Sequence, residues 1–330
     1  MVRGSRLGGD QEYPVLSLPL RIGTRGSPMA LSQTGLVRRR LMALHADLAA
    51  AGAIEMVTIR TTGDRVQDRR LAEIGGKGLF TKEIEEALLA GHIDLAVHSL
   101  KDMETWLPSG LEIACVLPRD DPRDALVSKN ATSLGTLPKG ARIGTASLRR
   151  QAQLLLRRPD LSVGPLRGNV NTRLRKLQEG EFDAVVLAVC GLERLGKADL
   201  ATEILSPEIM LPAVGQGVLA IECRAGDDAV RALLNPVHDP GTAACAGAER
   251  AMLAALDGSC RTPIAGLAEL HGKRLTIEGL VLKPDGSGEV RGRREGDIDD
   301  AEALGAELGG ELRRRAGRDL GLGDPANPAE

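Results

Sequence analysis

Aromatic side chains are nearly absent from this sequence. Phe, Trp and Tyr together make up 1% of 330 residues, namely Tyr13, Phe80, Trp106 and Phe182. Stacking of nucleic acid bases on aromatic rings is therefore excluded as a main binding mode, and the core must be aliphatic. A net charge of −2 also gives no general attraction to nucleic acid or to a membrane surface.

Paired cysteines and long apolar runs are missing as well. The five cysteines are widely spaced and form no CxxC pair, so we expect no disulfide, no metal site and a reducing cytoplasm. No run of about 20 apolar residues could span a membrane. The first 18 residues lack the apolar core of a signal peptide, and we expect a flexible extension there.

One stretch, residues 92–102 (HIDLAVHSLKD), stands out among the segments that are present. A short aliphatic run bounded by polar residues is typical of a buried strand in a parallel sheet. Its last residues then lie at the carboxyl edge, where open α/β proteins bind ligands. Lys101 and Asp102 are candidates for chemistry there, with a strand-end ion pair as the alternative. His98 alternates into the strand and is interpreted as a supporting residue.

A strand–Gly-Thr–Ser–helix pattern occurs at residues 22–31 and again from 141 onward. Residues 91–94 and 180–183 likewise occupy matching places before two later strands. This repetition predicts two related α/β lobes, although two ordinary α/β units could agree by chance. Between the two lobes, which the chain crosses twice, we expect a ligand-binding cleft.

The last part of the chain differs. A helix at 242–256, strands near 264–270 and 274–282, and a helix near 299–315 predict a small α+β domain. The expected division is an extension at 1–18, domain 1 at 19–118 and 217–236, domain 2 at 119–216, and domain 3 at 237–330.

Basic residues cluster where they oppose a helix dipole. Arg149 and Arg150 begin a predicted helix, Arg167 ends a strand and Arg173 begins the next helix. Cations at helix N-termini are unfavourable unless an anion binds there, and Arg favours planar carboxylate or phosphate. The alternative is a solvated basic face, which suits the more distal Arg157, Arg158, Arg175 and Lys176.

Cys260 differs from the other cysteines because it lies in a Gly-Ser turn before Arg261. An accessible thiol beside a cation is biased towards thiolate. Cys260 is thus a candidate nucleophile or attachment point, while the other four cysteines are interpreted as small buried residues.

Several segments together resemble the porphobilinogen deaminase family, also called hydroxymethylbilane synthases. In chain order they are IGTRGSPMALSQ (22–33), GGKGLF (75–80), DLAVHSLKD (94–102), PRDDPRDALVS (118–128), GTASLRRQ (144–151), LRGNVNTRL (166–174), LPAVGQG (211–217) and GSCRTPIAG (258–266). Each alone is a weak signal, but their order over most of the chain is specific.

The resemblance implies a fold and a reaction. The fold has two lobes like those of type-2 periplasmic binding proteins, plus the α+β domain. The enzyme, a transferase of tetrapyrrole biosynthesis, condenses four porphobilinogen molecules head to tail. Ammonia leaves at each step, and hydrolysis releases hydroxymethylbilane. The growing chain starts from one covalent dipyrromethane cofactor per protein, and its carboxylates account for the arginines.

The resemblance also implies residue roles. Cys260 matches the thiol that holds dipyrromethane by a thioether. Asp102 matches the catalytic aspartate, which stabilises a cationic intermediate and moves protons at successive rings. Lys77 and Phe80 match the lid segment. The positions that match binders of cofactor and substrate carboxylates are Arg25, Ser27, Lys101, Ser147, Arg149, Arg150, Arg167, Arg173 and Arg194.

The alternative function is a non-enzymatic, two-lobed carboxylate-binding protein, which would leave Cys260 and the third domain without a role. For the enzyme we expect porphobilinogen and the growing polypyrrole as partners, no nucleic acid, no membrane and a monomer.

Overall fold

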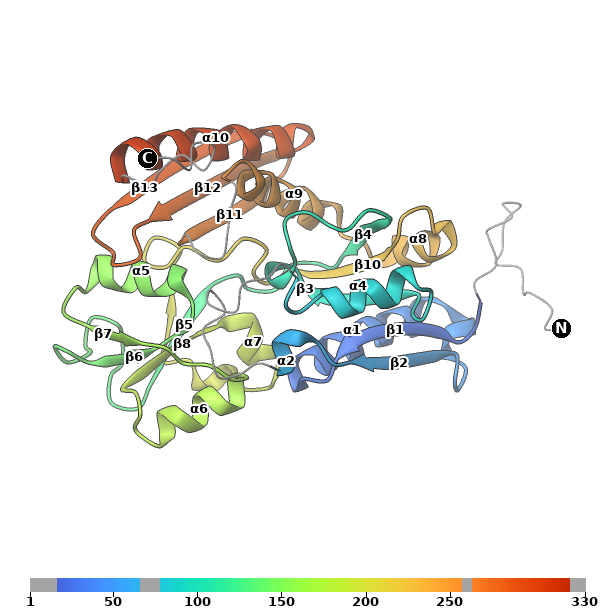
Figure 1. Ribbon diagram of the computed structural model, residues 1–330, viewed down its shortest axis with the longest axis horizontal. Helices are drawn as coiled ribbons and strands as arrows, with labels where there is room; N and C mark the ends of the chain where they lie inside the picture. Colours follow the sequence, from blue (N-terminus) through green and yellow to red (C-terminus); the bar gives the residue numbers. More distant parts are fainter. Residues whose placement is uncertain (1–16, 66–77, 257–262, 321–330) are drawn as a thin grey trace. The chain divides into compact units, whose positions relative to one another are not determined.

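The computed structural model describes residues 17–65, 78–256 and 263–320 (Figure 1). The α/β fold class predicted from the sequence is confirmed. The described residues form two mixed five-stranded sheets and one three-stranded antiparallel sheet. They fall into two compact units, one of residues 17–65, 78–118 and 219–240, the other of the remaining described residues.

The first unit contains a sheet in the order β2-β1-β3-β10-β4. β1 runs parallel to β2 and β3, whereas β10 runs antiparallel to β3 and β4. Its strands are β1 (Leu20–Arg25), β2 (Ile54–Ile59), β3 (Leu95–Ser99), β4 (Leu111–Val116) and β10 (Leu219–Arg224). Its helices are α1 (Pro28–Leu44), α2 (Thr62–Arg65), α4 (Lys82–Leu89) and α8 (Asp228–Leu234), with short 3-10 turns η1 (Ala46–Ala49), η2 (Leu100–Asp102) and η4 (Asn235–Val237).

The second unit contains a sheet in the order β7-β6-β8-β5-β9. Its strands are β5 (Asp124–Ser128), β6 (Arg142–Gly144), β7 (Ser162–Gly164), β8 (Ala184–Ala188) and β9 (Glu203–Leu205). The helices of this part are α5 (Leu148–Arg157), α6 (Val170–Gln178) and α7 (Val189–Arg194), with the 3-10 turn η3 (Ala198–Leu200).

The two five-stranded sheets match strand for strand. In each, a central strand pairs in parallel with one neighbour and antiparallel with the other. In the sequence, β10 comes after all five strands of the second sheet, whereas the matching strand β5 comes before the other four strands of its own sheet. The matching strands therefore occur in a different order along the chain in the two sheets.

A serine caps the helix that follows β1, and another serine caps the helix that follows β6. Ser27 caps α1 by accepting a hydrogen bond from the Ala30 N–H, and Ser147 caps α5 by accepting one from the Arg150 N–H. Serine satisfies a backbone donor that the helix itself leaves unpaired. From the sequence we expect α1 to run to about residue 51, but it ends at Leu44 and a 3-10 turn follows.

The third sheet consists of β11 (Ile264–His271), β12 (Arg274–Leu282) and β13 (Glu289–Asp297). Figure 1 shows α10 (Ala301–Leu320) along one face of it, near α9 (Pro240–Ala255). α9 and α10 touch closely because Gly305 has no side chain. A Cβ at Gly305 would lie 2.0 Å from the Ala248 carbonyl oxygen.

The sequence-based prediction missed β13. This strand is rich in Arg and Glu, and most of its side chains are at least partly exposed. It lies at the edge of the sheet, where charged residues are common and the apolar alternation is weak. No helix among the described residues is long and apolar enough to cross a membrane. The three-domain division and the cleft stay predictions.

Glu249 on α9 is fully buried and joins separate segments of the second unit. Its carboxylate pairs with Arg119 at 2.5 Å and accepts hydrogen bonds from the backbone N–H groups of Gly215 and Ala268. A buried carboxylate is tolerated only with such partners.

We expect Glu249→Gln to lower the free energy of unfolding by about 3–5 kcal/mol, because it leaves Arg119 without its counter-charge. Equilibrium urea denaturation measures the change. Glu179→Gln, which breaks the exposed pair with Arg175, is the control and should cost less than about 1 kcal/mol. Equal effects of the two substitutions would contradict this role of Glu249.

Candidate active site

A small cavity of about 70 Å³ lies at the carboxyl ends of β1 and β3. Arg25, Ser27, Phe80 and Asp102, all predicted site residues, line it together with His98. Parallel neighbours β1 and β3 end at the same edge of the sheet, which brings these distant sequence positions together. Asp102 is exposed at the end of η2, directly after β3.

Arg25 is held by two contacts. Its guanidinium pairs with Asp64 at 2.5 Å and lies 4.2 Å from the centre of the Phe80 ring. Burial opposes ionisation of Asp64, but the Arg25 guanidinium outweighs it and lowers the pKa of that carboxyl. The two contacts therefore fix the position of the Arg25 guanidinium at the cavity.

Several polar residues line the cavity, among them Gln33, His98 and Ser99. Gln33 Nε2 donates to Ser99 Oγ at 2.8 Å. His98 Nε2 lies 3.0 Å from Glu222 Oε2, and both side chains are buried. Lys101 is exposed beside Asp102. Lys101 is not among the residues that line the cavity.

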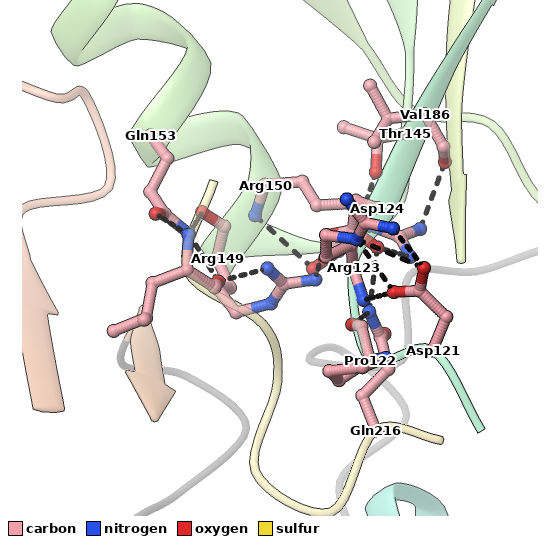
Figure 2. A network of polar contacts seen from close by, with 12 residues as sticks. Asp121, Pro122, Arg123, Asp124, Thr145, Arg149, Arg150, Gln153, Val186 and Gln216 are labelled. Carbon is pink, nitrogen blue, oxygen red and sulfur yellow. Dashed lines mark hydrogen bonds and ion pairs between the residues drawn. The ribbon is translucent and has the colours of Figure 1, made fainter. Parts of the chain in front are cut away.

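In the second unit, Arg149 and Arg150 share one buried carboxylate (Figure 2). Arg149 Nη2 and Arg150 Nη2 each lie 2.7 Å from an oxygen of Asp124. Gln216 Nε2 donates to the same carboxylate at 2.9 Å, and Arg149 also donates to the Leu211 carbonyl oxygen. Figure 2 shows these side chains converging from α5, β5 and the segment around Gln216.

This cluster has more positive than negative charge. Burial opposes ionisation of Asp124, but Arg149 and Arg150 outweigh it and hold the pKa of that carboxyl well below its usual range. Burial lowers the pKa of Arg149, although Asp124 acts in the opposite direction. Two guanidinium groups face one carboxylate, and Nε of both arginines has no hydrogen-bond partner among the described residues.

The other predicted arginines are placed differently. Nη2 of Arg167 is buried without a hydrogen-bond acceptor in the described part of the chain. Arg173 Nε donates to the Gly168 carbonyl oxygen at 2.8 Å. Arg194 pairs with Asp120 at 2.7 Å and donates to the Gly217 carbonyl oxygen. Ser147 acts as the cap of α5.

Two predicted residues, Lys77 and the cofactor-attachment candidate Cys260, lie outside the described residues. The other four cysteines are buried. Within residues 17–65, 78–256 and 263–320, no group of three or more His, Cys, Asp or Glu residues could hold a metal ion.

Sequence reasoning missed the partners of the predicted cations. Asp64, Asp124 and Glu222 lie far along the chain from the residues they pair with. Asp124 and Gln216 do fall inside quoted segments, 118–128 and 211–217. Their presence there was a usable signal, but it did not identify their partners.

Comparison with known proteins agrees with the resemblance. Residues 20–232 match the family model described as "Porphobilinogen deaminase, dipyromethane cofactor binding domain". Residues 243–314 match "Porphobilinogen deaminase, C-terminal domain". Among solved structures, a putative methionine-binding lipoprotein of Bacillus subtilis is 14% identical with a TM-score of 0.41, and it covers 67% of this chain and 90% of its own. A periplasmic substrate-binding protein from Coxiella burnetii is 16% identical, also with a TM-score of 0.41, over 70% of this chain and 96% of its own.

Whole-length relatives are much more similar. The porphobilinogen deaminase of Nitrobacter winogradskyi is 55% identical over 296 residues, which cover 90% of this chain and 93% of the relative. That of Paracoccus denitrificans is 54% identical over 302 residues, covering 92% and 96%. Both family models and these relatives agree with the segments quoted above, so the chain belongs to the porphobilinogen deaminase family.

Proposed function

We propose that Asp102 is the catalytic carboxylate with which this chain carries out the activity of its family. That activity is hydroxymethylbilane synthesis, a transferase reaction of tetrapyrrole biosynthesis on a dipyrromethane cofactor. The observation that carries the assignment is the cavity at the ends of β1 and β3, where Asp102 and Arg25 lie together. Family membership disfavours the alternative of a non-enzymatic carboxylate-binding protein.

Asp102 suits the charge changes of the reaction. Loss of ammonia from the aminomethyl group of porphobilinogen leaves a cation delocalised over the pyrrole ring. An ionised carboxylate beside that ring stabilises the cation and accepts hydrogen bonds from pyrrole N–H groups. Arg25 lies at the same cavity and can bind a substrate carboxylate, while Ser27 and Lys101 extend the polar edge.

The described arginines fit a group that carries several carboxylates. The excess positive charge around Arg149 and Arg150, and the buried Arg167 Nη2 without an acceptor among the described residues, both favour an anionic ligand. When bound to Cys260, dipyrromethane would supply the primer from which the polypyrrole grows. Ser147, Arg173 and Arg194 belong to the same proposed set of cofactor and substrate contacts, and Lys77 and Phe80 to a proposed lid.

The same proposal includes porphobilinogen and the growing polypyrrole as ligands, a cytoplasmic location and a monomeric state. Cys115, Cys190 and Cys223 are buried and form no disulfide within the described residues, which suits a reducing compartment. The support for the monomeric state is that exposed large apolar residues, such as Leu44, Trp106 and Ile204, come from separate parts of the sequence.

Asp102→Asn should lower kcat by about 10²–10³-fold, because the amide has nearly the same shape but cannot neutralise a cation. A steady-state assay of hydroxymethylbilane formation measures the change, and circular dichroism checks the fold. Asp228→Asn, at an exposed aspartate of the same unit, is the matched control and should keep wild-type turnover. Near-normal turnover of Asp102→Asn would overturn its assignment.

Cys260→Ser should abolish covalent attachment of the cofactor, because a serine oxygen does not form the thioether. Intact mass spectrometry of protein from cells that make porphobilinogen should show the dipyrromethane mass on the wild type and on Cys190→Ala, but not on Cys260→Ser. An unmodified wild-type mass from such cells would argue against the proposed cofactor attachment.

Arg167→Gln should lower kcat/KM for porphobilinogen by about 10- to 100-fold, equivalent to one charge-assisted hydrogen bond of about 1.5–3 kcal/mol. Steady-state kinetics on cofactor-loaded protein test this. The control is Arg175→Gln, which removes an exposed arginine already paired with Glu179. Equal kinetics of the two variants would remove Arg167 from the binding set.

A further inference from the structure

A buried histidine and a buried glutamate are in contact beside the Asp102 cavity. His98 on β3 and Glu222 on β10 place Nε2 and Oε2 3.0 Å apart, with side-chain exposures of 4% and 0%. His98 also lines the cavity that contains Asp102 and Arg25. Neither the Glu222 oxygens nor His98 Nε2 has another hydrogen-bond partner among the described residues, so the imidazole is the polar group that faces this carboxylate there.

The second five-stranded sheet shows that the fold does not require this pair. Ile22 lies beside Leu95 in the first sheet and Ile143 beside Ala184 in the second, which aligns β3 with β8. Counting along these strands, Leu187 occupies the position of His98. Glu222 lies opposite Ala96, and Val127 lies opposite the corresponding residue of β8. The matching pair is therefore Leu187 and Val127, both buried and apolar.

The stability of the fold does not require polar side chains at the positions of His98 and Glu222. Replacing a buried ion pair by well-packed apolar residues of similar volume is often neutral or stabilising. The first sheet nevertheless has this polar pair, and its histidine lines the cavity of the proposed catalytic carboxylate. A chemical role explains both facts.

We propose that His98 accepts the proton released at each condensation and that Glu222 is the positioning residue that orients and stabilises its imidazolium form. This inference rests on the proposed function. Two residues then share the work at the site. Asp102 stays ionised beside the cationic pyrrole, and His98 takes the proton.

The step balances in atoms and charge. The carbon–nitrogen bond of the substrate ammonium group breaks and releases ammonia, and the new carbon–carbon bond forms on a pyrrole α-carbon. The carbon–hydrogen bond at that α-carbon then breaks, and its electrons restore the aromatic ring. The proton goes to Nδ1 of His98, while Nε2 stays against Glu222. The imidazolium passes it to the departing ammonia, which leaves as ammonium, and His98 is neutral again.

The charged neighbours of His98 suit this cycle. Glu222 faces it from β10, Glu85 from α4, and Arg25 and Asp102 line the same cavity. Burial raises the pKa of Glu85, and the nearby Glu222 and Glu104 act in the same direction, whereas His98 opposes them. Glu222 is the carboxylate in direct contact with His98, at 3.0 Å.

The decisive variant gives the first sheet the apolar pair of the second, His98→Leu with Glu222→Val. We expect the cofactor mass and the thermal midpoint to be retained and kcat to fall by about 10²–10⁴-fold, the usual contribution of a positioned acid or base. With porphobilinogen deuterated at its free α-carbon, a primary isotope effect on turnover should appear or increase in the variant. A merely structural role would not make carbon–hydrogen cleavage limiting.

The control is Arg21→Gln with Asp94→Asn, which removes another ion pair between β1 and the start of β3, at the opposite edge of the sheet, and should leave kcat unchanged. Turnover of His98→Leu/Glu222→Val within about threefold of wild type, far below the loss expected for a proton acceptor, would overturn the inference. If that variant does not fold or lacks cofactor, His98→Gln decides by the same rate and isotope readouts. Wild-type protein that makes no hydroxymethylbilane would contradict the proposed function itself. An active wild type with an unimpaired double variant contradicts only the role of His98.

Discussion

Compensation of buried charge is the constraint on which this structure depends most. Glu249 is buried against Arg119, Asp124 against Arg149 and Arg150, and Glu222 against His98. An unpaired buried charge would cost several kcal/mol, so each pair ties together segments that are distant in the sequence. The first of these joins parts of the second unit, whereas the other two lie at or beside residues proposed to act on substrate and cofactor.

The two five-stranded sheets share one strand order but differ in where they keep charge. In the first, the charged pair lies between β3 and β10. In the second, the matching positions are apolar, and the charges lie between β5 and the first turn of α5. A common scaffold thus presents a carboxylate with a nearby imidazole in one unit and guanidinium groups in the other. These suit, respectively, proton and cation chemistry and the binding of carboxylates.

Much of the fold could be predicted from the sequence because its signals are local. Short aliphatic runs, the serine caps Ser27 and Ser147, and the repeated Gly-Thr turn each act within a few residues. β13 was missed because an exposed edge strand of Arg and Glu has no clear apolar alternation. The lid and attachment residues Lys77 and Cys260 rest on the family resemblance alone, since the structure does not describe them.

The sequence by itself determined the family, the reaction and the identity of the candidate residues, because ordered motifs need no coordinates to be read. Only the tertiary structure decided which charges meet. Asp64 beside Arg25, Asp124 between two arginines, and Glu222 behind His98 are pairings between distant segments. Strand order brings such segments together, and local sequence patterns do not encode which residue of one strand faces which residue of another. For this reason Arg149 and Arg150 could be predicted to bind an anion, while the carboxylate of Asp124 that they share could not be predicted.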